Sequence, residues 1–346
     1  MKKIFLCALL LSSVSSICFA DYVTGLDAFQ RGDYVNAEYQ LRDCSDQKDP
    51  KCQYLMGFMY YHGFSVIQDY EKAFNLFKEA ADQEYTEART FLGYMYDEGK
   101  GVRRNRNKAF ELYQKSADEG DPTAIMNLGV LYYRGEGVPQ NYVKAFELMN
   151  SIESEKRPIL QFYLGNLYFY GYGTSKNLPK AIEHYNKAAQ LTSVEAHYML
   201  GHLYQNGIGV EPDLERSRAF YEYAAVRGLP MAQFNLATMY ADGQLGTVDK
   251  VTAYAWLAEA AKNDFDRAKE ALERLSESMS ASEISRAKAQ GIVINKRVAD
   301  NDAPSPIRPE EAYGVEYKTT TKQTTETKND SFAARPRRSS RMMRRR

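Results

Sequence analysis

The chain has 346 residues with 45 basic and 45 acidic side chains, so its formal charge of zero gives no global sign of a nucleic-acid-binding protein. Hydrophobic residues make up 44% of the sequence and the mean hydropathy is −0.55, values typical of a chain that can bury a core. Four cysteines are too few for a disulfide-rich scaffold. Residues 21–330 carry a formal charge of −9, whereas the last sixteen residues carry seven Arg and no acid. The sequence therefore predicts an acidic body with a basic tail.

Residues 1–20 have the pattern of a secretory signal peptide. Two lysines form a basic start, residues 4–11 form a short apolar run, and Cys18 and Ala20 supply small residues before a cleavage site. The apolar run is short for a permanent membrane anchor, although an uncleaved anchor is the alternative. We therefore expect the mature chain to be exported. The periplasm is the expected compartment, with outer-membrane association or secretion as alternatives.

Residues 21–49 predict a pair of helices that precedes the rest of the fold. Ala28, Ala37 and Leu41 recur at helical spacing, and residues 32–33 (Gly-Asp) are typical of the turn between the two helices. A terminal pair with one polar face is what a stack of repeats needs for solubility. We therefore expect this pair to be an N-terminal cap.

A repeat of 36 residues runs from residue 50 to about residue 265. Tyrosine recurs at this spacing far more often than composition allows by chance, at Tyr60, Tyr96, Tyr132, Tyr168, Tyr204 and Tyr240. Glycine forms a parallel series at Gly63, Gly99, Gly135, Gly171, Gly207 and Gly243. These series divide the chain into six predicted repeats, 50–85, 86–121, 122–157, 158–193, 194–229 and 230–265.

Each repeat predicts two helices joined by a short loop. The first helix begins near Pro50 in the first repeat and ends at the recurring glycine, which can adopt the left-handed conformation. The second helix follows a residue that accepts a first-turn N–H bond, namely Asp69, Asn105, Asn141, Asn177, Asp213 or Asp249. The third repeat has Ile152-Glu153 where two alanines are expected, and the sixth has Ala237 for glycine and an altered loop at Leu245-Gly246. We expect irregular packing at both points.

Residues 266–296 are expected to form C-terminal capping helices. Ala268 and Leu275 belong to one apolar stripe at helical spacing. Residues 280–283 (Ser-Ala-Ser-Glu) have the pattern of a capping box before a further helix. Gly291 is expected to end that helix.

Residues 297–346 are expected to form a disordered tail, first Thr-rich and then Arg-rich. Such a composition cannot bury enough apolar surface to order the chain. Arginines near an anionic membrane each contribute to attraction, so the tail is a candidate tether to an anionic envelope surface. The residues concerned are Arg335, Arg337, Arg338, Arg341, Arg344, Arg345 and Arg346. The alternative is a solvated tail that folds back on the acidic body.

At these positions the chain resembles the Sel-1-like repeat (SLR) family, a relative of the tetratricopeptide repeat. The family pattern A-x-x-x-L-G-x-x-Y-x-x-G-x-G-V-x-x-D-x-x-K-A-x-x-W-Y-x-K-A-A is visible in residues 88–117 and 124–145. The resemblance implies an all-α fold, a right-handed α-solenoid of helix–turn–helix repeats, with residues 21–49 as a tetratricopeptide-like cap. It also implies roles such as assembling envelope or motility complexes, or contacting host proteins, without choosing among them.

Cys44 and Cys52 are the cysteines that remain once a signal peptide is removed. In an oxidising compartment they are a candidate disulfide, and no His or further Cys accompanies them as a metal site. A cysteine-rich subgroup of SLR proteins has disulfides at this eight-residue spacing, so the resemblance implies a Cys44–Cys52 bond, with a buried free pair as the alternative. Some members of that subgroup have been linked to β-lactam binding or hydrolysis, and this analogy is the only indication of an enzyme.

The sequence predicts no catalytic, metal or cofactor site. Residues 93–100 resemble a phosphate-binding loop, but five residues separate the glycines and Gly101 stands where Ser or Thr would hold magnesium. His197 and His202 are five residues apart, a spacing that does not place both on one helical face. We therefore expect a protein that is not an enzyme, without cofactor or nucleic-acid partner, and monomeric.

The first helices of the repeats predict a concave groove rich in aromatic side chains, which are typical of binding hot spots. The predicted groove residues are Tyr54, Phe58, Tyr61, Tyr94, Tyr133, Arg134, Phe162, Phe169, Tyr170, Tyr198, His202 and Phe234. For Tyr54, Phe162, Tyr198 and Phe234 the alternative is packing between adjacent helices. The expected ligand is an extended or helical segment of a protein partner. The sequence thus predicts an exported scaffold that binds protein through this groove.

Overall fold

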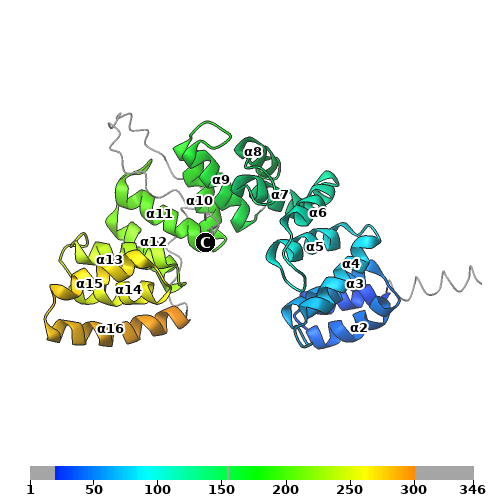
Figure 1. Cartoon of the computed structure of the whole chain (residues 1–346), viewed down its shortest axis with the longest axis horizontal. Helices are drawn as coiled ribbons and strands as arrows, with labels where there is room; N and C mark the ends of the chain where they lie inside the picture. Colours follow the sequence, from blue (N-terminus) through cyan, green and yellow to red (C-terminus); the bar gives the residue numbers. More distant parts are fainter. Residues whose placement is uncertain (1–19, 154–155, 301–346) are drawn as a thin grey trace, which may run out of the picture. The chain divides into compact units, whose positions relative to one another are not determined.

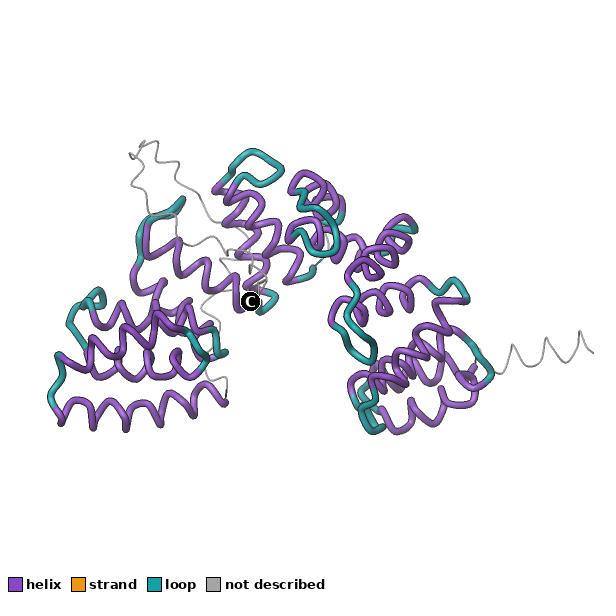
Figure 2. The backbone as a smooth tube through the Cα atoms, viewed as in Figure 1, coloured by secondary structure: helices purple, strands orange, loops and turns teal. Residues whose placement is uncertain are grey.

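The computed structural model describes residues 20–153 and 156–300, and every regular element in these ranges is a helix (Figure 1). Figure 2 shows how short loops alternate with the helices. The predicted signal peptide and the chain from residue 301 onward, with its seven arginines, lie outside the described residues. The chain divides between Ile152 and Glu153 into two compact units, which we call the N-terminal and the C-terminal unit.

The N-terminal unit begins with a helix over residues 20–30. The helices that follow are α2 (Tyr34–Asp46), α3 (Pro50–His62), α4 (Tyr70–Asp82), α5 (Thr86–Glu98), α6 (Arg106–Asp118), α7 (Pro122–Arg134) and α8 (Tyr142–Ser151). From α2 to α8, each helix packs against the next one along the chain. The predicted N-terminal helix pair is therefore the helix over residues 20–30 together with α2.

The C-terminal unit continues the same succession. Its helices are α9 (Pro158–Tyr170), α10 (Leu178–Gln190), α11 (Val194–Asn206), α12 (Leu214–Val226), α13 (Pro230–Ala241), α14 (Lys250–Lys262), α15 (Asp266–Glu277) and α16 (Ala281–Asp300). Neighbours along the chain pack together up to α15, and α16 then packs on α14 and reaches α12. The predicted all-α solenoid of helix–turn–helix repeats is confirmed. In the described ranges, no helix is both long and apolar enough to cross a membrane.

The helix ends follow the sequence pattern. Each predicted N-cap side chain accepts a hydrogen bond from the N–H three residues ahead, over 2.9–3.1 Å, at Asp69, Asn105, Asn141, Asn177, Asp213 and Asp249. Five first helices end on a left-handed glycine, namely Gly63, Gly99, Gly135, Gly171 and Gly207. The sixth first helix, α13, is one residue shorter and ends on Asp242 instead.

Helix α8 departs from the repeat, and the C-terminal capping helices follow the prediction only in part. Helix α8 has 10 residues where α4, α6, α10, α12 and α14 each have 13, and it ends at the sequence where two alanines were expected. The capping box forms, because the N–H of Ser280 donates to Glu283 over 2.8 Å and the N–H of Glu283 donates to Ser280 over 3.3 Å. The prediction that Gly291 ends the last helix is wrong. Gly291 lies inside α16, which continues to Asp300, beyond the predicted tail boundary.

Close approach of helices explains a glycine in the middle of the first helix of most repeats. A Cβ on Gly165 of α9 would lie 2.6 Å from the ring of Tyr185 of α10, a contact that no side chain tolerates. The equivalent Gly201 meets Tyr221 in the same way, at 2.7 Å. Both tyrosines are fully buried, so these two repeats gain a large aromatic side chain in the core because the facing helix has no side chain at this position.

The implied disulfide joins the N-terminal cap to the first repeat. Cys44 of α2 and Cys52 of α3 are bonded, with 6.0 Å between their Cα atoms, and both are fully buried. They belong to a core cluster with Ala28, Leu41 and Met59. The bond therefore closes a short loop at the point where the cap packs on the repeats.

Removing this disulfide should lower the free energy of unfolding by about 2.5 kcal/mol, because the cross-link restricts the unfolded chain. Alanine occupies the equivalent position of the next repeat in both cases, at Ala80 and Ala88. The double variant Cys44→Ala and Cys52→Ala is therefore compatible with the packing. Urea unfolding followed by far-UV circular dichroism measures the loss, with reduced wild type as the control. Equal midpoints for oxidised wild type and the variant would contradict the prediction.

Candidate functional site

In the N-terminal unit, predicted groove residues from two consecutive repeats meet around Phe91. The Phe91 ring centroid lies 5.6 Å from Phe58, 5.1 Å from Tyr61 and 5.5 Å from Tyr94. Sequence reasoning missed Phe91, because only the positions borrowed from tetratricopeptide helices were assigned to the groove. The rings thus form one continuous patch on α3 and α5.

The same patch extends toward the N-terminal cap. Phe58 contacts His62 at 4.3 Å and Phe29 at 5.8 Å between ring centroids. Phe64 stacks on Tyr34 at 4.3 Å and on His62 at 5.1 Å. We call the whole set the α3–α5 aromatic cluster, consisting of Phe29, Tyr34, Phe58, Tyr61, His62, Phe64, Phe91 and Tyr94.

Exposure divides the cluster into surface and core. Tyr94 leaves 36% of its surface exposed, and His62 is exposed, whereas Tyr61 retains only 9%. Burial is the main cause that holds the pKa of the Tyr61 hydroxyl well above its usual value, and a hydrogen bond with Tyr94 is the second. Tyr61 was expected at the surface, so this expectation is wrong. It packs in the core because the rings of the next repeat cover it.

The row formed by Tyr54, Phe162, Tyr198 and Phe234 also contributes to packing. Tyr54 contacts the ring of Phe77, and burial raises the pKa of its hydroxyl to about 12. Tyr198 is buried, whereas Tyr54, Phe162 and Phe234 are half-buried. For Tyr198 the structure therefore favours packing over a groove position.

The remaining predicted groove residues of the N-terminal unit lie at the end of α7. Tyr133 is half-buried and its ring lies 5.3 Å from that of Tyr142. Arg134 is exposed, and its guanidinium lies 3.9 Å from the carboxylate of Glu136. Both residues are thus accessible at a helix end, beside an acidic loop residue.

The C-terminal unit has its own aromatic group at the end of α9. Phe169 and Tyr170 lie 4.8 Å apart between centroids, and Tyr170 stacks on Tyr172 at 5.1 Å. The ammonium of Lys176 lies 5.8 Å from the centre of the Phe169 ring. His202 of α11 is half-buried, and burial lowers its pKa. These rings are half-buried, so only part of each is accessible.

Polar side chains occupy a buried column on the first helices that sequence reasoning missed. The column sits four residues before the mid-helix glycine position and consists of Gln53, Arg89, Gln161, His197 and Gln233, with Ile125 in the third repeat. Each polar member has a hydrogen-bond partner from a neighbouring turn or helix. Arg89, Gln161 and Gln233 therefore link their repeats to the preceding ones. Gln53 bonds within its own repeat, and His197 bonds the N-cap residue of its own helix.

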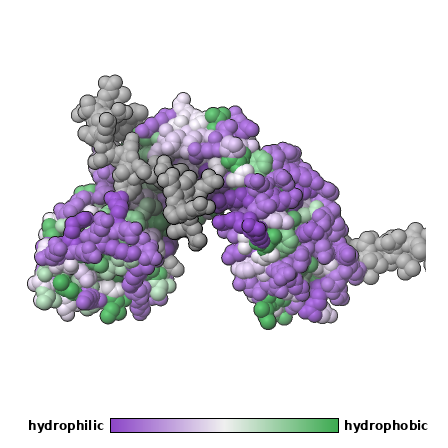
Figure 3. Space-filling view, in the orientation of Figure 1, coloured by the Kyte–Doolittle hydropathy of each residue, from purple (hydrophilic) through white to green (hydrophobic). Residues whose placement is uncertain are grey.

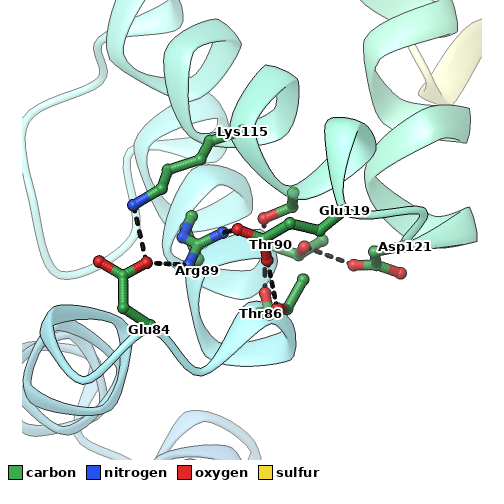
Figure 4. Close-up of polar contacts among 8 residues, drawn as sticks. Glu84, Thr86, Arg89, Thr90, Lys115, Glu119 and Asp121 are labelled. Atoms are coloured by element: carbon green, nitrogen blue, oxygen red, sulfur yellow. Dashed lines mark hydrogen bonds and ion pairs between the residues drawn. The ribbon is translucent and has the colours of Figure 1, made fainter.

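Arg89 makes the strongest of these links (Figure 4). Its guanidinium lies 2.8 Å from Glu84, in the turn before α5, and 2.6 Å from Glu119, in the turn after α6. Lys115 contacts Glu84 at 2.8 Å, and Thr86 donates to Glu119 at 2.5 Å. The hydrogen bond from Lys115 lowers the pKa of Glu84, and those from Thr86 and Arg89 lower the pKa of Glu119.

Of the residues that the structure describes, no three His, Cys, Asp or Glu side chains are grouped so as to hold a metal ion. On the face shown in Figure 3, hydrophobic side chains lie in patches among hydrophilic ones. What the chain does present is a set of partly exposed aromatic rings on successive repeats.

Comparison with known proteins gives the family. Six segments match the Sel1 repeat, at residues 50–85, 86–121, 122–151, 158–193, 194–228 and 230–265. A Sel1 repeat protein from Oxalobacter formigenes is similar in structure, with 30% identity, a TM-score of 0.60, and coverage of 70% of this chain and 99% of that one. The third match ends at residue 151, where α8 ends early.

A second similar structure is a protective antigen present in uropathogenic Escherichia coli strains, which displays an SLR fold. It is 23% identical with a TM-score of 0.61, and the match covers 83% of this chain but 62% of that one, so it shows the fold alone. The comparison with curated proteins gave no match. Sel1-repeat proteins are scaffolds that generally bind protein partners. With six repeats over more than half of its length, the chain belongs to the Sel1 repeat family.

Proposed function

We propose that this protein is an exported, non-catalytic scaffold that binds a protein partner through aromatic side chains on the first helices of its repeats. The α3–α5 aromatic cluster is the observation that carries the proposal. Its rings come from the cap and two consecutive repeats, and Tyr94 is 36% exposed. Such rings offer contact area at a low cost in side-chain entropy.

Export is the second element of the proposal. It is supported by the signal-peptide pattern of residues 1–20 and by the Cys44–Cys52 disulfide, a bond that persists in oxidising compartments. The periplasm is the proposed location, and assembly of cell-envelope complexes or contact with host proteins are the proposed roles. Tethering by the Arg-rich residues 335–346 stays a prediction.

The surroundings of Tyr94 indicate the kind of partner. Asp97 and Glu98 follow it on the same helix, and Glu98 is exposed with no ion pair to any described residue. An extended or helical segment that places an apolar side chain on Phe58 and Tyr94, with a cation near Glu98, complements this surface. Such a segment contacts residues of two consecutive repeats at once, so its affinity depends on the distance between the repeats.

Truncating the two accessible rings should abolish partner capture. Alanine at Phe58 and Tyr94 should weaken binding by about 2 kcal/mol or more per hot-spot ring, roughly 30-fold each, while the far-UV circular dichroism stays helical. A photoreactive residue at position 94 in the native cell, read by mass spectrometry, identifies the partner. The matched control is position 39, because Tyr39 is 76% exposed on α2 but lies outside the cluster.

Two outcomes would contradict the groove assignment. One is a crosslinking pattern at position 94 identical to that at position 39, which would indicate collisions with abundant proteins. The other is full affinity of the partner for the Phe58→Ala, Tyr94→Ala variant. A single partner that appears only with the probe at position 94 supports the proposal.

A further inference from the structure

The loops between the two helices of each repeat share one backbone framework. In all six, the N–H of the N-cap residue donates to the carbonyl oxygen of the recurring tyrosine over 2.8–2.9 Å, in the pairs Asp69–Tyr60, Asn105–Tyr96, Asn141–Tyr132, Asn177–Tyr168, Asp213–Tyr204 and Asp249–Tyr240. The framework forms whichever side chains the loop carries. The formation of this loop backbone therefore does not explain why the loops differ in charge.

The loop of the second repeat stands out in charge. Residues 99–105 contain Lys100, Arg103 and Arg104 and no acid, whereas the five equivalent loops together contain one cation, Lys176. Arg103 and Arg104 are exposed, and none of the three cations forms an ion pair with the described residues. The adjacent cations on α6 differ, because Arg106 pairs with Asp97 and Lys108 with Glu111.

Local structure does not require these charges. The Nε of Arg104 donates to the carbonyl oxygen of Asp97 over 2.6 Å. Glutamine makes the same bond at the equivalent positions, from Gln68 to Tyr61 and from Gln140 to Tyr133, both over 2.9 Å. An uncharged residue thus makes the same bond to the backbone, so this bond does not require the positive charge of Arg104.

The neighbouring loop adds an exposed apolar side chain. Ile67, in the loop over residues 63–69, is 91% exposed, the highest value among the large hydrophobic residues described. The two loops adjoin, because the backbone of Gly101 packs on Tyr70, so closely that a Cβ there would lie 2.1 Å from the Tyr70 carbonyl oxygen. The ammonium of Lys100 lies 5.0 Å from the centre of the Tyr70 ring.

We propose that loops 63–69 and 99–105 form a docking surface for an anionic lipid membrane. The three unpaired cations face the phosphate-bearing headgroups, and Ile67 enters the interface between headgroups and acyl chains. Cations alone would also suit an acidic protein, but cations together with an isoleucine that is 91% exposed in the adjoining loop are the combination that peripheral membrane binding uses. This surface goes beyond the proposed protein-binding role and does not depend on it.

Co-sedimentation of the full chain with phosphatidylcholine vesicles containing 30% phosphatidylglycerol tests the proposal. The variant Lys100→Gln, Arg103→Ser, Arg104→Gln borrows its residues from equivalent positions, Gln244, Ser175 and Gln68. We expect it to partition roughly 100-fold less than wild type, since each cation near an anionic surface contributes several-fold. The charge-matched control is Arg31→Gln, Arg42→Gln, Lys78→Gln. These exposed cations each pair with a carboxylate four residues away, so the control should bind like wild type.

A tryptophan at position 67 reports the contact directly. The chain has one Trp, Trp256, which is 2% exposed, so its signal stays constant. In Ile67→Trp, brominated phosphatidylglycerol should quench the new fluorescence, whereas Val35→Trp, at an exposed position on α2, should stay unquenched. The proposal is overturned if wild type does not bind the vesicles, if both triple variants bind equally, or if the loop acts only on an acidic polypeptide such as polyglutamate.

Discussion

Lowering the pH from 7 to 4 should destabilise the C-terminal unit by about 3 kcal/mol for each of two buried histidines, His184 and His197. Burial, reinforced by the charges of Lys187 and Lys180, lowers the pKa of His184 to about 4. Burial also lowers the pKa of His197 to about 4, against a hydrogen bond to the Ser193 carbonyl that favours the charged form. Both rings are therefore neutral in the folded protein at neutral pH.

The loss of stability at low pH follows from the difference in histidine pKa between the folded and the unfolded chain. An unfolded histidine titrates near pH 6.5, so between pH 6.5 and 4 the unfolded chain binds protons that the folded chain does not. Stability is therefore complete above pH 6.5 and falls as the pH drops toward 4. Glu153 lies 3.6 Å from His184, but its side chain is 41% exposed and water screens its charge, so burial dominates.

Urea unfolding at several pH values, followed by Trp256 fluorescence, measures this effect, because Trp256 is buried in α14 of the C-terminal unit. The variant His184→Leu, His197→Gln takes residues from equivalent positions, Leu148 and Gln161, and should lose most of the acid sensitivity. His62→Gln, in the N-terminal unit, is the control and should leave the Trp256 transition unchanged. Identical pH profiles for the double variant and wild type would refute the assignment.

The sequence predicts the helices well, because each helix end depends on one residue and its nearest neighbours. An Asp or Asn before the second helix caps it, and a glycine after the first helix ends it, wherever the repeat lies in the chain. The period then supplies the fold, since identical supersecondary units stack in one way. Gly291 fails as a stop signal because α16 packs on α14 on both sides of it, with Ala287 and Ile294 buried, and this packing outweighs the cost of a glycine.

The site is less predictable, because periodicity aligns equivalent residues without showing which of them touch. Lysine also recurs every 36 residues, at Lys72, Lys108, Lys144 and Lys180. The structure brings this series onto the tyrosine series, with the Lys72 ammonium 4.1 Å from the Tyr60 ring centre and the Lys180 ammonium 4.9 Å from that of Tyr168. Tyrosine and lysine are 12 residues apart, on two helices joined by a loop, so the sequence alone does not indicate this contact. Burial of Tyr61 depends likewise on Phe91 of the next repeat.

Replacing Arg89 by alanine should lower the free energy of unfolding by about 3 kcal/mol. Arg89 is 2% exposed and is the largest of the fully buried side chains. Truncation removes its packing and also leaves Glu84 and Glu119 without the cation between them. These carboxylates belong to turns on either side of the second repeat, so the link between neighbouring repeats is lost with the charge.

Glutamine at position 89 separates the contribution of the polar link between repeats from the contribution of side-chain packing. It occupies the equivalent position in the first, fourth and sixth repeats, where Gln53, for example, donates to Glu79 over 2.7 Å. Arg89→Gln should therefore cost clearly less than Arg89→Ala, and Lys115→Gln, which removes an exposed contact to Glu84, should cost least. Urea midpoints of the three variants give the order. If Arg89→Ala unfolds at the wild-type midpoint, the prediction is wrong. The buried guanidinium would then add nothing to the free energy of unfolding, and apolar contacts alone would hold the repeats together.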